Sequence, residues 1–189
     1  MIILKKLQIA RYGYILMSMV FYIAGIVYVM ISDIPSLILC NIGGIIFIVY
    51  GVIKVIGYLS NDLYNLAFQY DLGCGMFLIA LGIIVLVRNE QIINYLSMAL
   101  GALVLLDSFL KIQTSRDAKE FGLETWKYIL GISILTGVFG ILVIVEPFKN
   151  EMVSRIITGC TLLCEGLMNQ CVIHYTVKKD VQLNDKGND

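Results

Sequence analysis

Charged residues are scarce in this sequence. Asp, Glu, Lys and Arg make up 15% of its 189 residues, whereas 59% are hydrophobic. A soluble fold of this length could not bury so much apolar surface without leaving large patches exposed to water. The net charge is zero and no basic stripe is present, so the sequence offers nothing that would bind nucleic acid. Composition therefore favours a protein whose solvent is the lipid bilayer.

Catalytic and metal-binding motifs are absent as well. The chain contains one histidine, His174, and no HExxH, GxSxG, Walker A or GxGxxG pattern. Three cysteines, Cys160, Cys164 and Cys171, precede His174 on one predicted helix, but their spacing matches no closed zinc pattern. We therefore expect no enzymatic activity, no metal and no cofactor.

What the sequence does contain is apolar stretches of the length needed to cross a bilayer, about 20 residues each. The stretches are Tyr12–Ile31, Ile34–Leu59, Leu66–Val87, Gln91–Gln113, Thr125–Val145 and Lys149–Val177. They predict an all-α integral membrane fold with one six-helix domain over residues 12–177. A short basic segment, 1–11, precedes this domain, and a polar tail, 178–189, follows it and is predicted to be disordered.

The segments between these stretches alternate in length. Short turns follow the first, third and fifth stretches, whereas longer polar segments, 60–65 and 114–124, follow the second and fourth and are predicted to be loops. The six helices are therefore predicted to form three helical hairpins, over about 12–59, 66–113 and 125–177.

The three hairpins are copies of one repeat. The copies start at Gly25, Gly82 and Gly140, which are 57 and 58 residues apart, and each has a matching glycine 19 residues further on. Small residues of this kind let helices approach closely in lipid. The glycines expected in helix packing are Gly25, Gly44, Gly51, Gly82, Gly101, Gly140, Gly159 and Gly166. Since each copy holds two spans, the copies are parallel repeats about an axis along the membrane normal.

One repeat position carries polar side chains within the apolar spans: Tyr50, Asp107 and Glu165. An ionisable group in a span costs at least a few kcal/mol, so it usually faces the protein interior and often carries function. The three residues should share one depth and form a candidate proton or polar site. Two local alternatives stay open at this point. Asp107 could pair with Lys111, four residues on, with both reaching the interface, and Glu165 could make only a structural hydrogen bond.

The distribution of Lys and Arg predicts the orientation. The face with both termini receives 11 of the 14 basic residues, Lys54 and Lys111 among them, and the opposite face receives 3. Both termini are therefore predicted to be cytoplasmic, in a multi-pass protein of the cytoplasmic membrane. Tyrosines near the span ends, including Tyr14, are expected in the aromatic belt at the membrane interface.

The third repeat carries a recognisable pattern. It consists of a glycine, an apolar helix, a proline turn, a second apolar helix with a central glycine, and an acidic residue followed by glycine: Gly140, Pro147, Gly159, Glu165 and Gly166. The second repeat keeps both helix glycines and the acid, and the first has tyrosine in place of the acid. This arrangement resembles the HdeD-like family of short-repeat bacterial membrane proteins associated with acid resistance. The resemblance implies six spans and a stress-related membrane role, without a defined biochemical activity.

Three functions are compatible with these observations. The first is a structural or stress-response protein of the HdeD type. The second is a small proton- or ion-linked transporter or channel that uses the intramembrane carboxylates. The third is a helical subunit of a membrane complex, either a homo-oligomer or an assembly with another membrane protein. A continuous polar cavity would favour transport, and an exposed glycine face would favour assembly.

The orientation gives a first testable prediction. A reporter fused after Asp189 should be active only in the cytoplasm, because the basic residues gather on the face of the termini. A cysteine placed at Asn89, in a turn on the other face, should react with an impermeant thiol reagent added outside the cell. The opposite result in both tests would contradict the predicted orientation.

Overall fold

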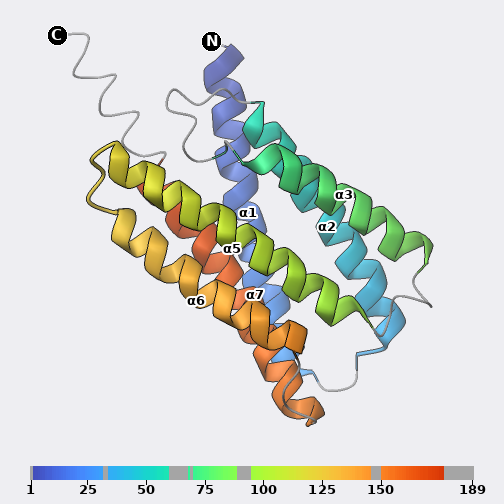
Figure 1. Cartoon of the computed structure of the whole chain (residues 1–189). Helices are drawn as coiled ribbons and strands as arrows, with labels where there is room; N and C mark the ends of the chain where they lie inside the picture. The colour runs from blue at the N-terminus through green and yellow to red at the C-terminus, as the bar shows by residue number, and fades with distance from the viewer. Residues whose placement is uncertain are drawn as a thin grey trace, which may run out of the picture.

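The computed structural model describes residues 2–31, 34–59, 68, 70–88, 95–145 and 150–176, and within these ranges the chain forms six α-helices (Figure 1). The helices are α1 (Ile2–Met30), α2 (Ser36–Tyr58), α3 (Asp71–Val87), α5 (Leu96–Glu120), α6 (Trp126–Val145) and α7 (Glu151–Thr176). Helix α1 begins at Ile2 and so includes nearly all of the basic segment 1–11. The predicted tail, 178–189, and most residues of the short turns lie outside the described residues.

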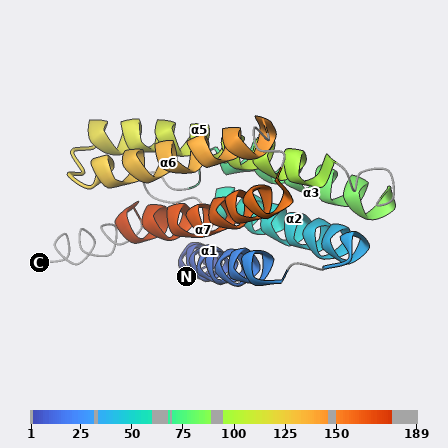
Figure 2. The ribbon, with the colours of Figure 1, turned by 90° about the horizontal axis from the view of Figure 1, so that it is seen from below.

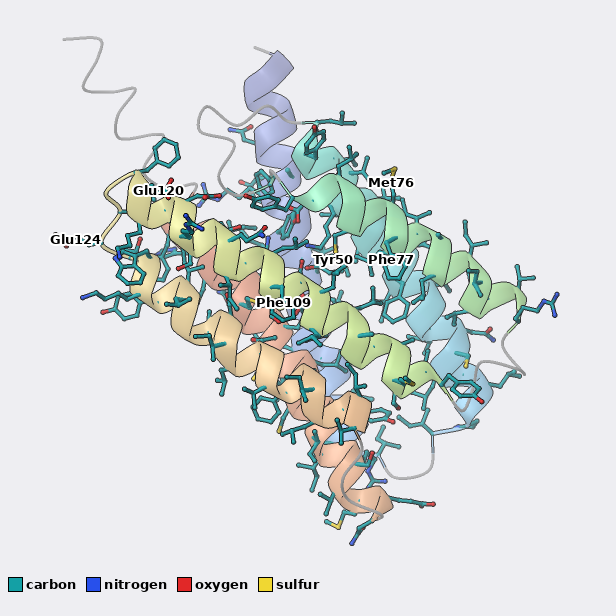
Figure 3. The ribbon with its side chains drawn as sticks, in the orientation of Figure 1. Tyr50, Met76, Phe77, Phe109, Glu120 and Glu124 are labelled. Carbon is teal, nitrogen blue, oxygen red and sulfur yellow. The ribbon has the colours of Figure 1, made fainter. Side chains whose placement is uncertain are left out.

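The helices are apolar on the outside of the bundle. Five of them are long and apolar enough to cross a membrane, and α3 is a shorter apolar helix of 17 residues. Met76, Phe77 and Phe109 project from the outer surface and are each more than half exposed, whereas Tyr50 lies in the interior (Figure 3). Two lysines and two aspartates are buried instead: Lys54, Lys111, Asp71 and Asp107. This inverted distribution suits lipid, and the chain is an all-α multi-pass membrane protein.

Helices from neighbouring repeats form the closest pairs. The most extensive contacts join α2 to α3, α5 to α6 and α1 to α7 (Figure 2). Each pair combines the second helix of one repeat with the first helix of the next, and α7 of the last repeat packs on α1 of the first. Smaller contacts between α1 and α2, α3 and α5, and α6 and α7 complete a ring. The repeats therefore interlock and close on each other, so the packing unit is offset from the hairpin by one helix.

Each close pair is built around facing glycines. A Cβ atom added to Gly25 would lie 2.8 Å from the carbonyl oxygen of Gly159, and one added to Gly159 would lie 2.9 Å from the carbonyl oxygen of Gly25. Only glycine permits backbones to approach this closely in lipid. The facing pairs are Gly25 with Gly159, Gly44 with Gly82, Gly51 with Gly75, and Gly101 with Gly140. The recurring glycines thus pack helices within the chain.

The predicted loop over 114–124 is wrong. Helix α5 continues to Glu120, at the end of the helix in Figure 3, and only residues 121–125 form the turn. Residues 114–120 include good helix formers and an i,i+4 pair of Arg116 with Glu120 at 3.5 Å, and Ala118 packs inward. Gly122 follows two residues after the end of the helix, and its φ of 72° is the left-handed conformation that terminates helices. The polar composition of residues 114–120 therefore indicates the end of the apolar span and not the end of the helix.

The glycine contacts predict a difference between two alanine variants on α3. At Gly75, a Cβ would lie 2.7 Å from the carbonyl oxygen of Gly51, whereas at Gly73 no atom lies within 4 Å. Both substitutions improve helix propensity, but only Gly75→Ala must separate α2 from α3, at a cost of about 1–3 kcal/mol. Thermal unfolding of the purified protein in micelles should show a lowered midpoint for Gly75→Ala alone. Equal midpoints for Gly75→Ala and Gly73→Ala would contradict the close approach.

Candidate functional site

The three equivalent polar residues of the repeat meet in the middle of the bundle. Tyr50 comes from α2, Asp107 from α5 and Glu165 from α7. The Tyr50 hydroxyl lies 3.4 Å from Oδ2 of Asp107 and 3.2 Å from Oε1 of Glu165. None of the three residues is more than 4% exposed. Both carboxyl groups therefore point into the protein, and α2, α5 and α7 meet where the axis of the repeat passes.

One helical turn further along, the repeat places Lys54, Lys111 and Asn169. The Lys54 ammonium lies 2.7 Å from Oδ1 of Asp107 and 2.9 Å from Oδ1 of Asp71. The Lys111 ammonium lies 3.7 Å from Oδ1 of Asp71. Among the described residues, the cation that forms an ion pair with Asp107 is thus Lys54 from another helix. The alternative in which Asp107 pairs with Lys111 at the membrane interface is wrong, because both side chains are buried and Lys111 pairs with Asp71.

The two lysines also change the orientation count. Both are almost completely buried, so neither reaches a membrane face. Without Lys54 and Lys111 the face of the termini keeps nine basic residues against three. The bias that predicts cytoplasmic termini is smaller but keeps its sign.

Two members of this cluster were missed from the sequence. The Tyr14 hydroxyl donates a hydrogen bond to Oδ2 of Asp71, the first residue of α3. Tyr14 is 1% exposed, so its expected place at the membrane interface is wrong. The missing signal was the repeat itself, because Tyr14 and Asp71 are 57 residues apart. Extending the comparison 11 residues before Gly25 and Gly82 would have aligned them.

Aromatic rings surround the Lys54 ammonium. Its nitrogen lies 4.8 Å from the ring centroid of Tyr50 and 5.6 Å from that of Tyr14. The two tyrosine rings contact each other edge to face, and Phe21 packs edge-on against Tyr50. Cation–π attraction is strongest where water is excluded, so these rings help to keep a charged lysine inside the bundle.

The cluster contains more acids than bases. It holds two buried ammonium groups, Lys54 and Lys111, and three buried carboxyl groups, Asp71, Asp107 and Glu165. With every group ionised the cluster carries one net negative charge in a site from which water is excluded. With one proton on a carboxyl group the cluster is neutral, and a net charge is expensive to bury.

The geometry locates that proton. The Tyr50 hydroxyl lies 3.4 Å from Oδ2 of Asp107 and 3.2 Å from Oε1 of Glu165, and both carboxyl groups line one small cavity. Two carboxylates are both acceptors, so they can form a hydrogen bond only when one of them is protonated. Asp107 already pairs with Lys54, whereas Glu165 forms no ion pair with any described residue. The arrangement therefore accommodates one proton shared by Asp107 and Glu165.

Hydrogen-bond donors are in short supply around Glu165. Its Oε1 lies 3.2 Å from both the Tyr50 hydroxyl and Nδ2 of Asn169, whereas its buried Oε2 receives no donor from the described residues. The Tyr50 hydroxyl oxygen also lies 2.9 Å from Oδ1 of Asn169, to which its single hydrogen can equally be donated. A buried acceptor without a donor costs about 1–3 kcal/mol. A proton on the carboxyl pair supplies the donor that the side chains lack.

A cavity of about 20 Å³ adjoins the carboxyl pair. Tyr50, Asp107 and Glu165 form its polar side, and the rest of its lining is apolar apart from Cys74. The space is sufficient for about one water molecule, which needs on the order of 10–15 Å³. The cavity is not the continuous polar passage that transport of a hydrated ion would favour.

The ion pairs predict how substitutions of Lys54 behave. Lys54→Met should lower the free energy of unfolding by about 3–5 kcal/mol, because it leaves Asp71 and Asp107 without their shared cation. Adding Asp107→Asn to Lys54→Met removes one negative charge and should recover part of the loss. Lys127→Met, at an exposed lysine, is the matched control and should change stability little. Denaturation in mixed micelles measures these variants together with Asp107→Asn alone, and strictly additive effects of Lys54→Met and Asp107→Asn would contradict the pairing.

Comparison with known proteins places the chain in a family. The family described as a short repeat of unknown function (DUF308) matches residues 16–87 and 73–145. The two matches begin 57 residues apart, which is the spacing between Tyr14 and Asp71 and between Tyr50 and Asp107. Neither the curated proteins nor the solved structures gave a significant match. Since the two matches together cover more than half of the sequence, the chain belongs to the DUF308 short-repeat family.

Proposed function

We propose that the chain is a stress-response membrane protein of the HdeD type, which responds to pH through exchange of the proton held by the pair formed by Asp107 and Glu165. The placement of these two carboxyl groups around the Tyr50 hydroxyl and one small cavity, inside a cluster of two cations and three acids, carries the proposal. The protein is assigned to the cytoplasmic membrane with both termini in the cytoplasm. The proposal attributes no catalytic activity to it.

Protonation of this pair would act on the whole bundle. Asp107 belongs to α5 and Glu165 to α7, and these two helices contact each other. When the proton leaves, two carboxylates repel across this contact in a medium of low dielectric constant. The repulsion opposes the close packing of α5 with α7, so proton binding and helix packing are linked.

The other two functions receive less support. Transport of a hydrated ion needs a polar passage, whereas the cavity beside Glu165 is water-sized and mainly apolar. Movement of protons alone remains compatible with the pair, and the same cluster would carry it. For a subunit of a complex, the recurring glycines would be the natural contact surface, but they face helices of their own chain.

Infrared spectroscopy of the protein in lipid tests proton binding directly. The wild-type protein should show the C=O stretch of a protonated carboxyl group, and this band should disappear in Glu165→Gln. The loss is expected whichever residue holds the proton, because the variant cluster has two cations and two carboxylates and is neutral without it. Glu124→Gln removes an exposed carboxylate and should leave the band unchanged. A band that survives in Glu165→Gln would refute the proposed site.

The role in acid resistance needs a cellular measurement. Cells that carry Glu165→Gln should survive exposure to acid less well than cells with the wild-type protein or with Glu124→Gln, at equal amounts of membrane-inserted protein. Equal survival of all three would contradict the stress role. Proton flux into liposomes that depends on Glu165 would favour the transport alternative.

A further inference from the structure

A second, larger cavity lies at the end of the bundle away from the termini. It has a volume of about 300 Å³ and is lined by the second half of α1, the first half of α2, the first turns of α5 and, on α7, Thr158 and Leu162. Ile31 and Ile34 lie at its edge, where α1 connects to α2, whereas the start of α1 and the end of α7 are at the opposite end of the bundle (Figure 1). Almost all of its lining is apolar. We call this cavity the vestibule.

The vestibule and the water-sized cavity are consecutive. Four side chains line both of them: Phe21, Phe47, Leu100 and Leu162. Phe21, Phe47 and Leu162 are buried, and Leu100 is half-buried. These four apolar side chains, which we call the constriction, therefore separate the vestibule from the space beside Asp107 and Glu165. In membrane channels an apolar constriction of this kind is closed while it is dry and conducts when water enters.

The inner end of this route has an unsatisfied acceptor. Glu165 is 2% exposed and lines the water-sized cavity, and its Oε2 has no donor among the described residues. A water molecule in the cavity would supply this donor, and the space suffices for one. The site therefore combines a buried carboxylate oxygen, a polar wall and room for one water molecule. These features allow proton transfer between the carboxyl group and the water.

Charge distinguishes the two directions of approach. Lys54 and Lys111 follow Tyr50 and Asp107 by one helical turn, on the side of the termini, and the groups on that side also include Tyr14 and Asp71. A cation approaching from the termini would meet two ammonium groups first. On the vestibule side the carboxyl pair is bordered by apolar residues and by the thiol of Cys74, so no positive charge from the lining of the inner cavity opposes a cation there. The other titratable groups nearby are the Tyr50 hydroxyl, which lines the same cavity, and the thiol of Cys164, the residue before Glu165 on α7.

We propose that the carboxyl pair exchanges its proton with the vestibule, through one water molecule in the inner cavity and a transient opening of the constriction. In the releasing direction, the O–H bond of the protonated carboxyl group breaks and the proton forms a new O–H bond with the water molecule. The resulting hydronium ion leaves through the vestibule, and the carboxylate remains. Uptake reverses these steps. The inference rests on the proposed proton binding and adds the route and its side. With cytoplasmic termini, the vestibule opens toward the cell exterior, where acid stress originates.

Time-resolved infrared spectroscopy after a pH jump tests this route. The carboxyl band of the wild-type protein should respond slowly. Phe47→Ala and Leu100→Ala, which widen the constriction, should accelerate the response at least about tenfold, as when a barrier falls by about 1.4 kcal/mol. Leu106→Ala shortens a lipid-facing leucine of the same helix as Leu100 and should leave the rate unchanged. Two widening variants are used because Phe47 is the more buried and its loss is the more harmful to folding.

Sidedness is measured in vesicles of known orientation. A pH jump on the vestibule side should drive the band faster than a jump on the side of the termini. Equal rates in Leu100→Ala and Leu106→Ala, or a faster response from the side of the termini, would overturn the route while leaving proton binding intact. The absence of the carboxyl band from the wild-type protein would instead refute the proposed function itself.

Discussion

The ion pairs of Lys54 are the interaction on which the rest of this structure depends. One buried ammonium group holds two carboxylates, Asp71 of α3 and Asp107 of α5, at 2.9 and 2.7 Å. Lys54 itself belongs to α2, so a single side chain joins the first copy of the repeat to both helices of the second copy. Charges placed in a membrane are stable only when they are paired in this way. The pairing uses both available cations and leaves the third acid, Glu165, to be neutralised by a proton.

The repeat explains how such a cluster can be built from few residues. Parallel copies about one axis bring equivalent positions together, so Tyr50, Asp107 and Glu165 meet because they are equivalent. The same symmetry sets facing glycines at the outer helix pairs and closes α7 onto α1. Departures from exact repetition supply the chemistry. Tyrosine replaces the acid in the first copy, and asparagine replaces lysine in the third, so a symmetric frame holds an asymmetric set of charges.

Much of the fold follows from the sequence, because long apolar stretches and a repeated glycine spacing both have simple physical causes. Apolar length predicts spans and parallel repeats predict a shared depth, which is why the meeting of Asp107 and Glu165 could be anticipated. The end of α5 could not be predicted in this way. Polar residues 114–120 include good helix formers, and a helix can continue through them whether or not lipid surrounds it.

The partners of the charged residues were harder to predict. The pattern of Lys111 four residues after Asp107 is common on surface helices, and local spacing gives no hint that Lys54 reaches across from another helix. Tyr14 and Asp71 lay outside the segments compared, although their separation of 57 residues equals the repeat. Which helix pairs pack most closely was also not accessible, because a hairpin pattern is compatible with contacts within or between copies.

The central claim is that the cluster of two lysines and three acids holds one proton, shared by Asp107 and Glu165, and is neutral. Site-resolved ¹³C shifts of the three side-chain carboxyl carbons, measured in lipid bilayers at neutral pH, test it most directly. The account predicts that Asp71 is ionised and that Asp107 and Glu165 together show one protonated carboxyl group. Three ionised carboxylates would contradict it.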